Sequence, residues 1–151
     1  MSFVRVAELC TKYSSFVVGI DIAGIENGHV YETEDEKLQV QAMKYAIEHG
    51  INRTVHAGER GGPQSVRNAL RLFSPSRIGH GYHIVDDDEL YDEMKKGAVH
   101  IETCPCSCVK IGGFWNDNFQ RHPIKRFFNR FYLCINRGSY LETLFLYTYC
   151  K

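Results

Sequence analysis

The sequence lacks an excess of either charge: its 151 residues carry 18 Lys and Arg residues and 18 Asp and Glu residues. Dedicated nucleic-acid-binding domains usually show a basic excess, so this balance argues against a nucleic-acid partner. No run reaches about 18 uninterrupted apolar residues, and we therefore expect no membrane insertion. Residues 1–10 lack the charged and apolar regions of a signal peptide, which predicts a cytoplasmic location.

The six cysteines do not have the spacing of a known zinc site, although three of them are close together in the segment CPCSC. Without a secretory signal, they are expected to be reduced thiols. A cytidine-deaminase-type zinc site requires the patterns H-x-E and P-C-x-x-C. The chain has H-x-x-E at His56 and Glu59 and P-C-x-C at Pro105, Cys106 and Cys108, so neither pattern is met.

Up to about residue 104, strand-like and helix-like segments alternate. Short apolar runs predict four strands, at 17–22, 52–56, 77–79 and 99–103. Apolar residues at helical spacing predict helices between the strands, at 38–46, 64–73 and 86–96. Strands that alternate with helices in this way indicate βαβ units and a parallel sheet.

Polar and titratable residues follow the end of each predicted strand. They are Asp21, His56 with Glu59, His80 with His83, and Glu102 with Cys104. Such residues after four successive strands favour a barrel, whose site lies at the carboxyl ends of its strands, over a doubly wound sheet. A complete barrel takes about 250 residues. We therefore predict an α/β fold, a partial (β/α)8 TIM barrel with four to five parallel strands and flanking helices.

The residue types at these strand ends suggest catalysis by a metal ion and a carboxyl group. His56 is a candidate zinc ligand, and Glu59 is a candidate proton donor that does not itself bind the metal. Taken alone, a histidine at a strand end is more often a hydrogen-bonded structural residue. His80 follows the neighbouring strand, and adjacent strands lie about 5 Å apart. The three side chains are therefore expected to share one substrate-sized pocket.

Four segments in this order and spacing, VVGIDIAG, GINRTVHAGE, RIGHGYH and HIETCPCS, resemble the adenosine deaminase family. The resemblance runs from about residue 5 to residue 114. It implies zinc-dependent hydrolytic deamination of adenosine and 2′-deoxyadenosine, purine nucleosides, to inosine and 2′-deoxyinosine plus ammonia. It also divides the chain into a segment from the carboxyl-terminal half of the barrel (1–113), a weaker remainder (114–136) and a divergent tail (137–151).

The resemblance also implies a role for five residues. His56 would be a ligand of the one Zn²⁺ of a complete site. Glu59 would protonate the purine ring nitrogen N1, and His80 would orient the attacking water and accept its proton. The backbone amide of Gly24 would donate a hydrogen bond to the purine, and Asp21 would be a further carboxylate in the substrate pocket.

The sequence departs from the family pattern in two places. The family has an H-x-H pair of zinc ligands, and none of the seven histidines here belongs to such a pair. After Asn136 the chain reads Arg137-Gly138-Ser139 where the family has Thr-Asp-Asp. We therefore expect weak zinc binding and little activity from this chain alone, and interpret its tail as a truncated or alternatively spliced reading frame.

These departures leave a non-catalytic alternative open. In that alternative the chain is a truncated isoform that associates with the full-length enzyme. An incomplete barrel has two exposed sheet edges, and such edges favour association. Self-association through the sheet edges is therefore a further expectation.

Overall fold

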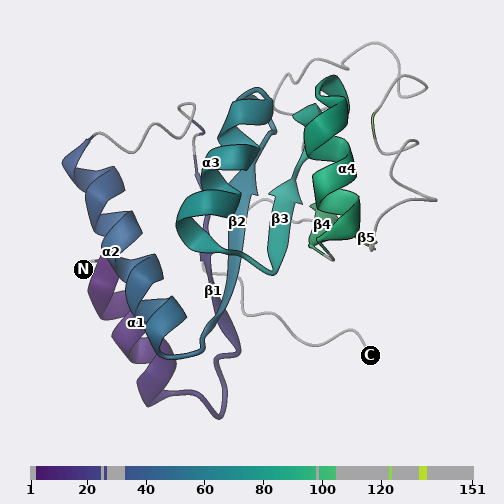
Figure 1. The fold of residues 1–151 in the computed structure, drawn as a ribbon. Helices are drawn as coiled ribbons and strands as arrows, with labels where there is room; N and C mark the ends of the chain where they lie inside the picture. Colours follow the sequence, from purple (N-terminus) through teal and green to yellow (C-terminus); the bar gives the residue numbers. More distant parts are fainter. Residues whose placement is uncertain are drawn as a thin grey trace.

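The computed structural model describes residues 3–24, 26, 33–97, 99–104, 123 and 133–135. Within these ranges the chain forms four α-helices, one 3-10 helix (η1) and five strands (Figure 1). Their order is α1 (Phe3–Lys12), β1 (Gly19–Ile22), α2 (Glu34–Glu48), β2 (Asn52–Ala57), α3 (Pro63–Phe73), β3 (Arg77–His80), η1 (Tyr82–Asp86), α4 (Asp88–Lys96), β4 (His100–Thr103) and β5 (Leu133–Ile135). None of the helices in these ranges is long and apolar enough to cross a membrane.

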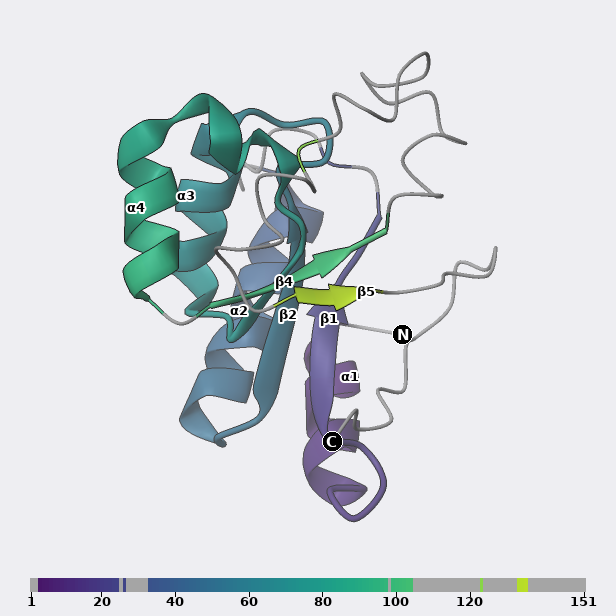
Figure 2. The same cartoon turned by 90° about the vertical axis from the view of Figure 1, so that its right-hand side faces the viewer.

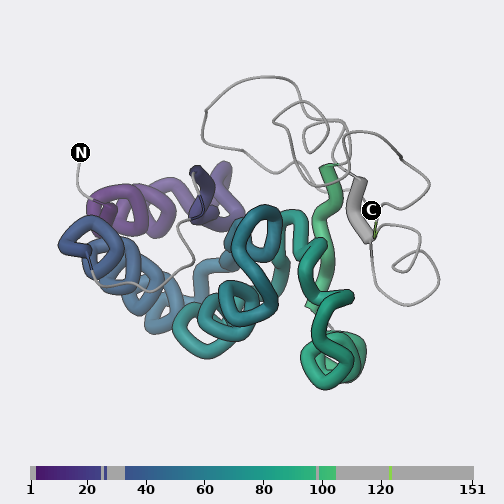
Figure 3. Tube along the Cα trace, turned by 90° about the horizontal axis from the view of Figure 1, so that it is seen from above, coloured from purple at the N-terminus to yellow at the C-terminus, as the bar shows by residue number. Residues whose placement is uncertain are grey.

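The strands form one parallel sheet in the order β1-β2-β3-β4-β5, in which each strand pairs with the next one in the chain. Helices α2, α3 and α4 lie on one side of this sheet (Figure 2). Seen from above, they follow one another along the outside of the curved row of strands (Figure 3). The prediction of parallel strands with flanking helices is confirmed.

The two faces of the sheet differ in chemistry because successive residues of a strand point to opposite faces. Val55, Ile78 and Ile101 are paired in register and fully buried, and they belong to the core that the sheet shares with the helices. In the next row of paired residues, His56 pairs with Gly79 and Gly79 with Glu102, and Glu102 in turn pairs with a residue of β5. The face turned away from the helices is therefore the polar one.

Two helices begin at side-chain caps. At α2, Thr33 and Glu36 form a reciprocal capping box, in which the Thr33 hydroxyl accepts the Glu36 N–H and the Glu36 carboxylate accepts the Thr33 N–H. At α4, the Asp87 carboxylate accepts the Leu90 N–H at 2.9 Å. Residue 87 is extended, so α4 begins at Asp88, two residues later than predicted, and residues 82–86 form η1.

Helix α1 is not among the predicted elements. Its buried residues are Ala7 and Cys10, and the helix packs along α2. A three-residue spacing of small apolar side chains is a weak signal for a helix, and this explains why it was missed. The expected segments 114–136 and 137–151 fall almost entirely outside the described residues, so this division of the chain stays a prediction.

Candidate active site at the carboxyl edge of the sheet

Three neighbouring strands bring their polar end residues together at the carboxyl edge of the sheet. His56 at the end of β2 has its Nδ1 3.5 Å from an Asp21 carboxylate oxygen on β1. The His56 ring centroid is 5.1 Å from that of His80 at the end of β3. Glu59 follows β2, and its Oε1 is 3.3 Å from His80 Nδ1. The structure thus gathers four of the five predicted site residues into one cluster.

His80 reaches this cluster through an unusual backbone conformation. By strand alternation it belongs to the face that packs on the helices, because it pairs with the buried Ala57. Its φ of 67° lies in the left-handed region, however, and redirects the side chain toward His56. This conformation costs a residue with a Cβ about 1–2 kcal/mol. Such strain is typical of functional sites, where the surrounding packing maintains it.

The His56 ring is fixed on two sides. Its Nδ1 lies 3.2 Å from the backbone oxygen of Ile22, so Nδ1 donates a hydrogen bond in the tautomer that carries its proton there. On β3, a Cβ at position 79 would lie 2.5 Å from His56 Cδ2, so the ring needs the glycine that is present. With Nδ1 as the donor, Nε2 is the nitrogen with a lone pair that can bind a metal ion.

Burial shifts the pKa values of three groups in the cluster. It raises the pKa of Asp21 to about 6, an effect that His56 opposes and Glu102 reinforces. It lowers the pKa of His80 to about 3, with a further lowering by His56. Burial also raises the pKa of Glu59. At neutral pH His80 is therefore a neutral imidazole that can accept a hydrogen bond or a proton.

Several polar atoms of the cluster are buried without a hydrogen-bond partner in the described part of the chain. They are both Asp21 carboxylate oxygens, Glu59 Oε1 and His80 Nδ1. Buried polar atoms are normally hydrogen-bonded, so this arrangement suits a polar ligand, water or a cation between the side chains. His56 fits the role of one metal ligand. Among residues 3–24, 26, 33–97 and 99–104, however, no three His, Cys, Asp or Glu side chains are grouped to hold a metal ion.

The remaining strand-end residues have other surroundings. Gly24 has a φ of 128°, and the space where a Cβ would lie is open. Glu102 is buried and pairs with Arg77 across the polar face at 3.1 Å. His83 Nδ1 lies 2.7 Å from an Asp86 carboxylate oxygen within η1.

Sequence reasoning missed Glu26. Its carboxylate accepts hydrogen bonds from four consecutive backbone N–H groups of the loop that carries Glu59. More than thirty residues separate Glu26 from this loop, and no residue pattern in the sequence connects them. The glycines of the loop were the available signal. Glycines allow the backbone to turn so that several N–H groups point to one place, and such N–H groups need a hydrogen-bond acceptor.

Comparisons with known proteins identify the family. A family profile described as adenosine deaminase matches residues 2–137. The chain belongs to the adenosine deaminase family. Mouse adenosine deaminase is 41% identical over 130 residues, which are 83% of this chain and 35% of the mouse protein. Chicken adenosine deaminase is 42% identical over 124 residues, 82% of this chain and 33% of the relative. The chain thus spans about a third of the length of these adenosine deaminases.

Two solved structures, of an amidohydrolase and of an adenine deaminase, have the same fold. An amidohydrolase from Burkholderia ambifaria, crystallised with bound zinc, superposes with a TM-score of 0.72 at 26% identity, over 89% of this chain and 36% of that one. An adenine deaminase from Arthrobacter aurescens gives a TM-score of 0.69 at 23% identity, over 90% and 41% of the two chains. The prediction of a partial TIM barrel is confirmed.

Proposed function

We propose that this edge of the sheet is part of a site that deaminates adenosine or 2′-deoxyadenosine hydrolytically, which yields inosine or 2′-deoxyinosine and ammonia. The observation that carries the proposal is the convergence of His56, Glu59 and His80, with Glu59 Oε1 3.3 Å from His80 Nδ1. Membership of the adenosine deaminase family supports it and favours catalysis over the non-catalytic alternative.

Each side chain has a proposed part in the reaction. The Glu59 carboxyl, whose pKa is raised by burial, donates a proton to purine N1, which makes C6 more electrophilic. The neutral His80 imidazole orients the water that attacks C6 and accepts its proton. His80 then gives this proton to the C6 amino nitrogen, the carbon–nitrogen bond breaks and ammonia leaves, while the C6 hydroxyl returns a proton to Glu59 and becomes the carbonyl of the product. The Gly24 amide hydrogen-bonds the purine, and Asp21 lies beside His56 as a polar wall of the pocket.

We propose Zn²⁺ as the cofactor, with His56 Nε2 as one of its ligands. A bound zinc ion lowers the pKa of water to about 7. The zinc in the amidohydrolase from B. ambifaria supports this proposal. Catalytic zinc sites use about three protein ligands, and the sequence has no H-x-H pair to accompany His56. The 151 residues alone should therefore bind zinc weakly and turn over adenosine very slowly.

A chimera tests the deaminase proposal directly. In it, residues 5–114 replace the matching segment of mouse adenosine deaminase, so that the rest of the barrel comes from a complete enzyme. The fall in ultraviolet absorbance on conversion of adenosine to inosine gives the rate. We expect deamination, and we expect Glu59→Gln to lower kcat by about a hundredfold or more. Glu34→Gln, in the exposed first turn of α2, should leave kcat unchanged.

Two results would contradict these expectations separately. A chimera that folds, as judged by circular dichroism, but does not deaminate adenosine would refute the proposed function. Robust turnover by the unmodified chain with added zinc would instead refute the need for ligands beyond those identified here, and would leave the deaminase proposal in place.

A further inference from the structure

The Glu26 carboxylate binds the backbone of the loop between β2 and α3 at several points. Its four backbone donors, with N···O distances, are Gly58 (2.6 Å), Glu59 (2.9 Å), Arg60 (2.8 Å) and Gly61 (3.0 Å). The Ser65 hydroxyl in the first turn of α3 also donates to Glu26 Oε1. A single side chain thus accepts hydrogen bonds from four successive residues and from the following helix.

This arrangement is specific to a carboxylate. Burial disfavours the charged form of Glu26, but the hydrogen bonds from Ser65 and the loop outweigh this effect and lower its pKa. Glu26 is therefore ionised at neutral pH, and both oxygens act only as acceptors. The approach is close, since a Cβ at position 61 would lie 2.6 Å from Glu26 Oε1.

Glu59 connects this anchored loop to the site. Its backbone N–H donates to Glu26 Oε2 at 2.9 Å, while its side-chain Oε1 lies 3.3 Å from His80 Nδ1. Its side chain is only 15% exposed. The backbone conformation that Glu26 stabilises therefore determines where the Glu59 carboxyl points.

We propose that Glu26 is a positioning residue, which fixes the backbone of residues 58–61 and thereby directs the Glu59 carboxyl toward His80. This inference rests on the proposed function, in which Glu59 is the proton donor. The negative charge of Glu26 also acts with burial to raise the pKa of Glu59. The position of the Glu59 carboxyl and its raised pKa thus both depend on Glu26.

Glu26→Gln is the sharpest variant. A glutamine has one acceptor oxygen, and its NH₂ group would face backbone N–H donors, so the loop loses either the hydrogen bond from Gly58 or those from Glu59, Arg60 and Gly61. Ser65→Ala is milder, because it removes one donor and leaves the Glu26 charge in place. Asp87→Asn is the matched control, because it alters a structural carboxylate at the start of α4, outside the loop.

Nuclear magnetic resonance of the isotope-labelled full chain provides two readouts. The first is the hydrogen-exchange rate of the amides of residues 58–61. The second is the titration of the Glu59 carboxyl carbon. We expect Glu26→Gln to speed the exchange by about tenfold or more and to lower the pKa of Glu59. Ser65→Ala should move both readouts less in the same direction, and Asp87→Asn should leave the Glu59 titration unchanged.

The control separates positioning from general stability. If Asp87→Asn moved the Glu59 titration as far as Glu26→Gln did, or if Glu26→Gln left it in place, the inference would be wrong. Should Glu26→Gln fail to fold, an unchanged Glu59 titration in Ser65→Ala would overturn the inference, and a lowered one would support it. Neither readout requires turnover, so an inactive chimera would count against deamination without affecting this result.

Discussion

At the residue scale, the His56 ring depends on the absence of a side chain on the neighbouring strand. Gly79 is paired with His56 in the register of β2 and β3. A Cβ there would lie 2.5 Å from His56 Cδ2 and 3.0 Å from Nε2. Both distances are shorter than a normal van der Waals contact. The ring is also held by its hydrogen bond to the Ile22 backbone oxygen. The ring therefore has little room to yield.

Gly79→Ala should displace the His56 ring and lower the free energy of unfolding by about 1–3 kcal/mol, because the added methyl group overpacks a filled space. Urea unfolding measures the stability, and the imidazole resonances report the ring position. Gly62→Ala is the matched control, because a Cβ at position 62 meets nothing within 4 Å. Equal effects of the two substitutions would contradict this explanation.

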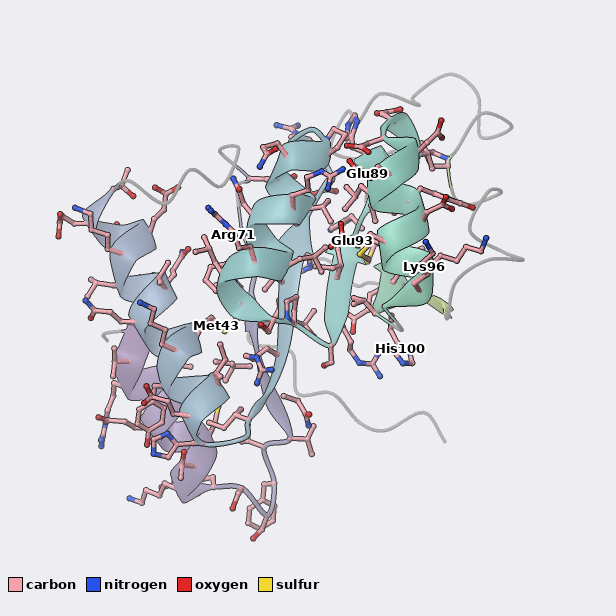
Figure 4. All side chains as sticks on the ribbon, viewed as in Figure 1. Met43, Arg71, Glu89, Glu93, Lys96 and His100 are labelled. Carbon is pink, nitrogen blue, oxygen red and sulfur yellow. The ribbon has the colours of Figure 1, made fainter. Side chains whose placement is uncertain are left out.

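At the element scale, helix α4 is tied to α3 by one arginine. Arg67 Nη2 lies 3.0 Å from both Asp87 carboxylate oxygens, and Arg67 also lies within 3.4 Å of Glu89 and Glu93. Figure 4 shows Glu89 and Glu93 on the part of α4 that is near α3. Asp87 also caps α4, so the same carboxylate starts the helix and attaches it to its neighbour.

Asp87→Asn should reduce stability in a pH-dependent way. The Leu90 N–H and the Arg67 guanidinium lower the pKa of Asp87. A lowered pKa means that the stabilisation is complete above the ordinary value for Asp, about 3.9, and is lost as the pH falls through the folded-state value. Asparagine still caps a helix, so the variant mainly removes the charge.

The wild-type chain should therefore have the higher urea midpoint at pH 7, and the difference from Asp87→Asn should shrink as the pH is lowered below about 4. Chemical denaturation at a series of pH values measures this difference. A gap that stays constant across the series would show that the Asp87 charge does not contribute.

At the scale of the whole molecule, the sheet has two ends. In the described part of the chain, β1 pairs only with β2, and β5 pairs only with β4. Unpaired strand edges carry N–H and C=O groups that can pair with another chain. We therefore propose that the 151 residues self-associate through these edges.

Sedimentation velocity over a wide concentration range tests this prediction, with a sedimentation coefficient that should rise with concentration. Val18→Lys places a charge just before β1 and should weaken association. Ile47→Lys, which alters an exposed apolar residue on α2, should not. A coefficient typical of a monomer at all concentrations would contradict the prediction.

Local patterns in the sequence determined the fold class and much of the helix-facing core. Short apolar runs sufficed for β1 to β4, and the buried face of α4 at Leu90, Tyr91 and Met94 follows from helical spacing. The motifs around His56 and His80 sufficed for the family. Each of these features depends on residues that are close together in the chain, so the sequence displays them directly.

Only the tertiary structure decided how the site is assembled. Strand alternation places His80 on the helix side, and a φ of 67° moves its ring toward His56. Glu26 reaches across more than thirty residues to bind the loop of Glu59. Contacts between distant segments and a left-handed backbone arise when the strands pair and the core packs. No local period in the sequence encodes them, because their free energy comes from neighbours that only folding brings together.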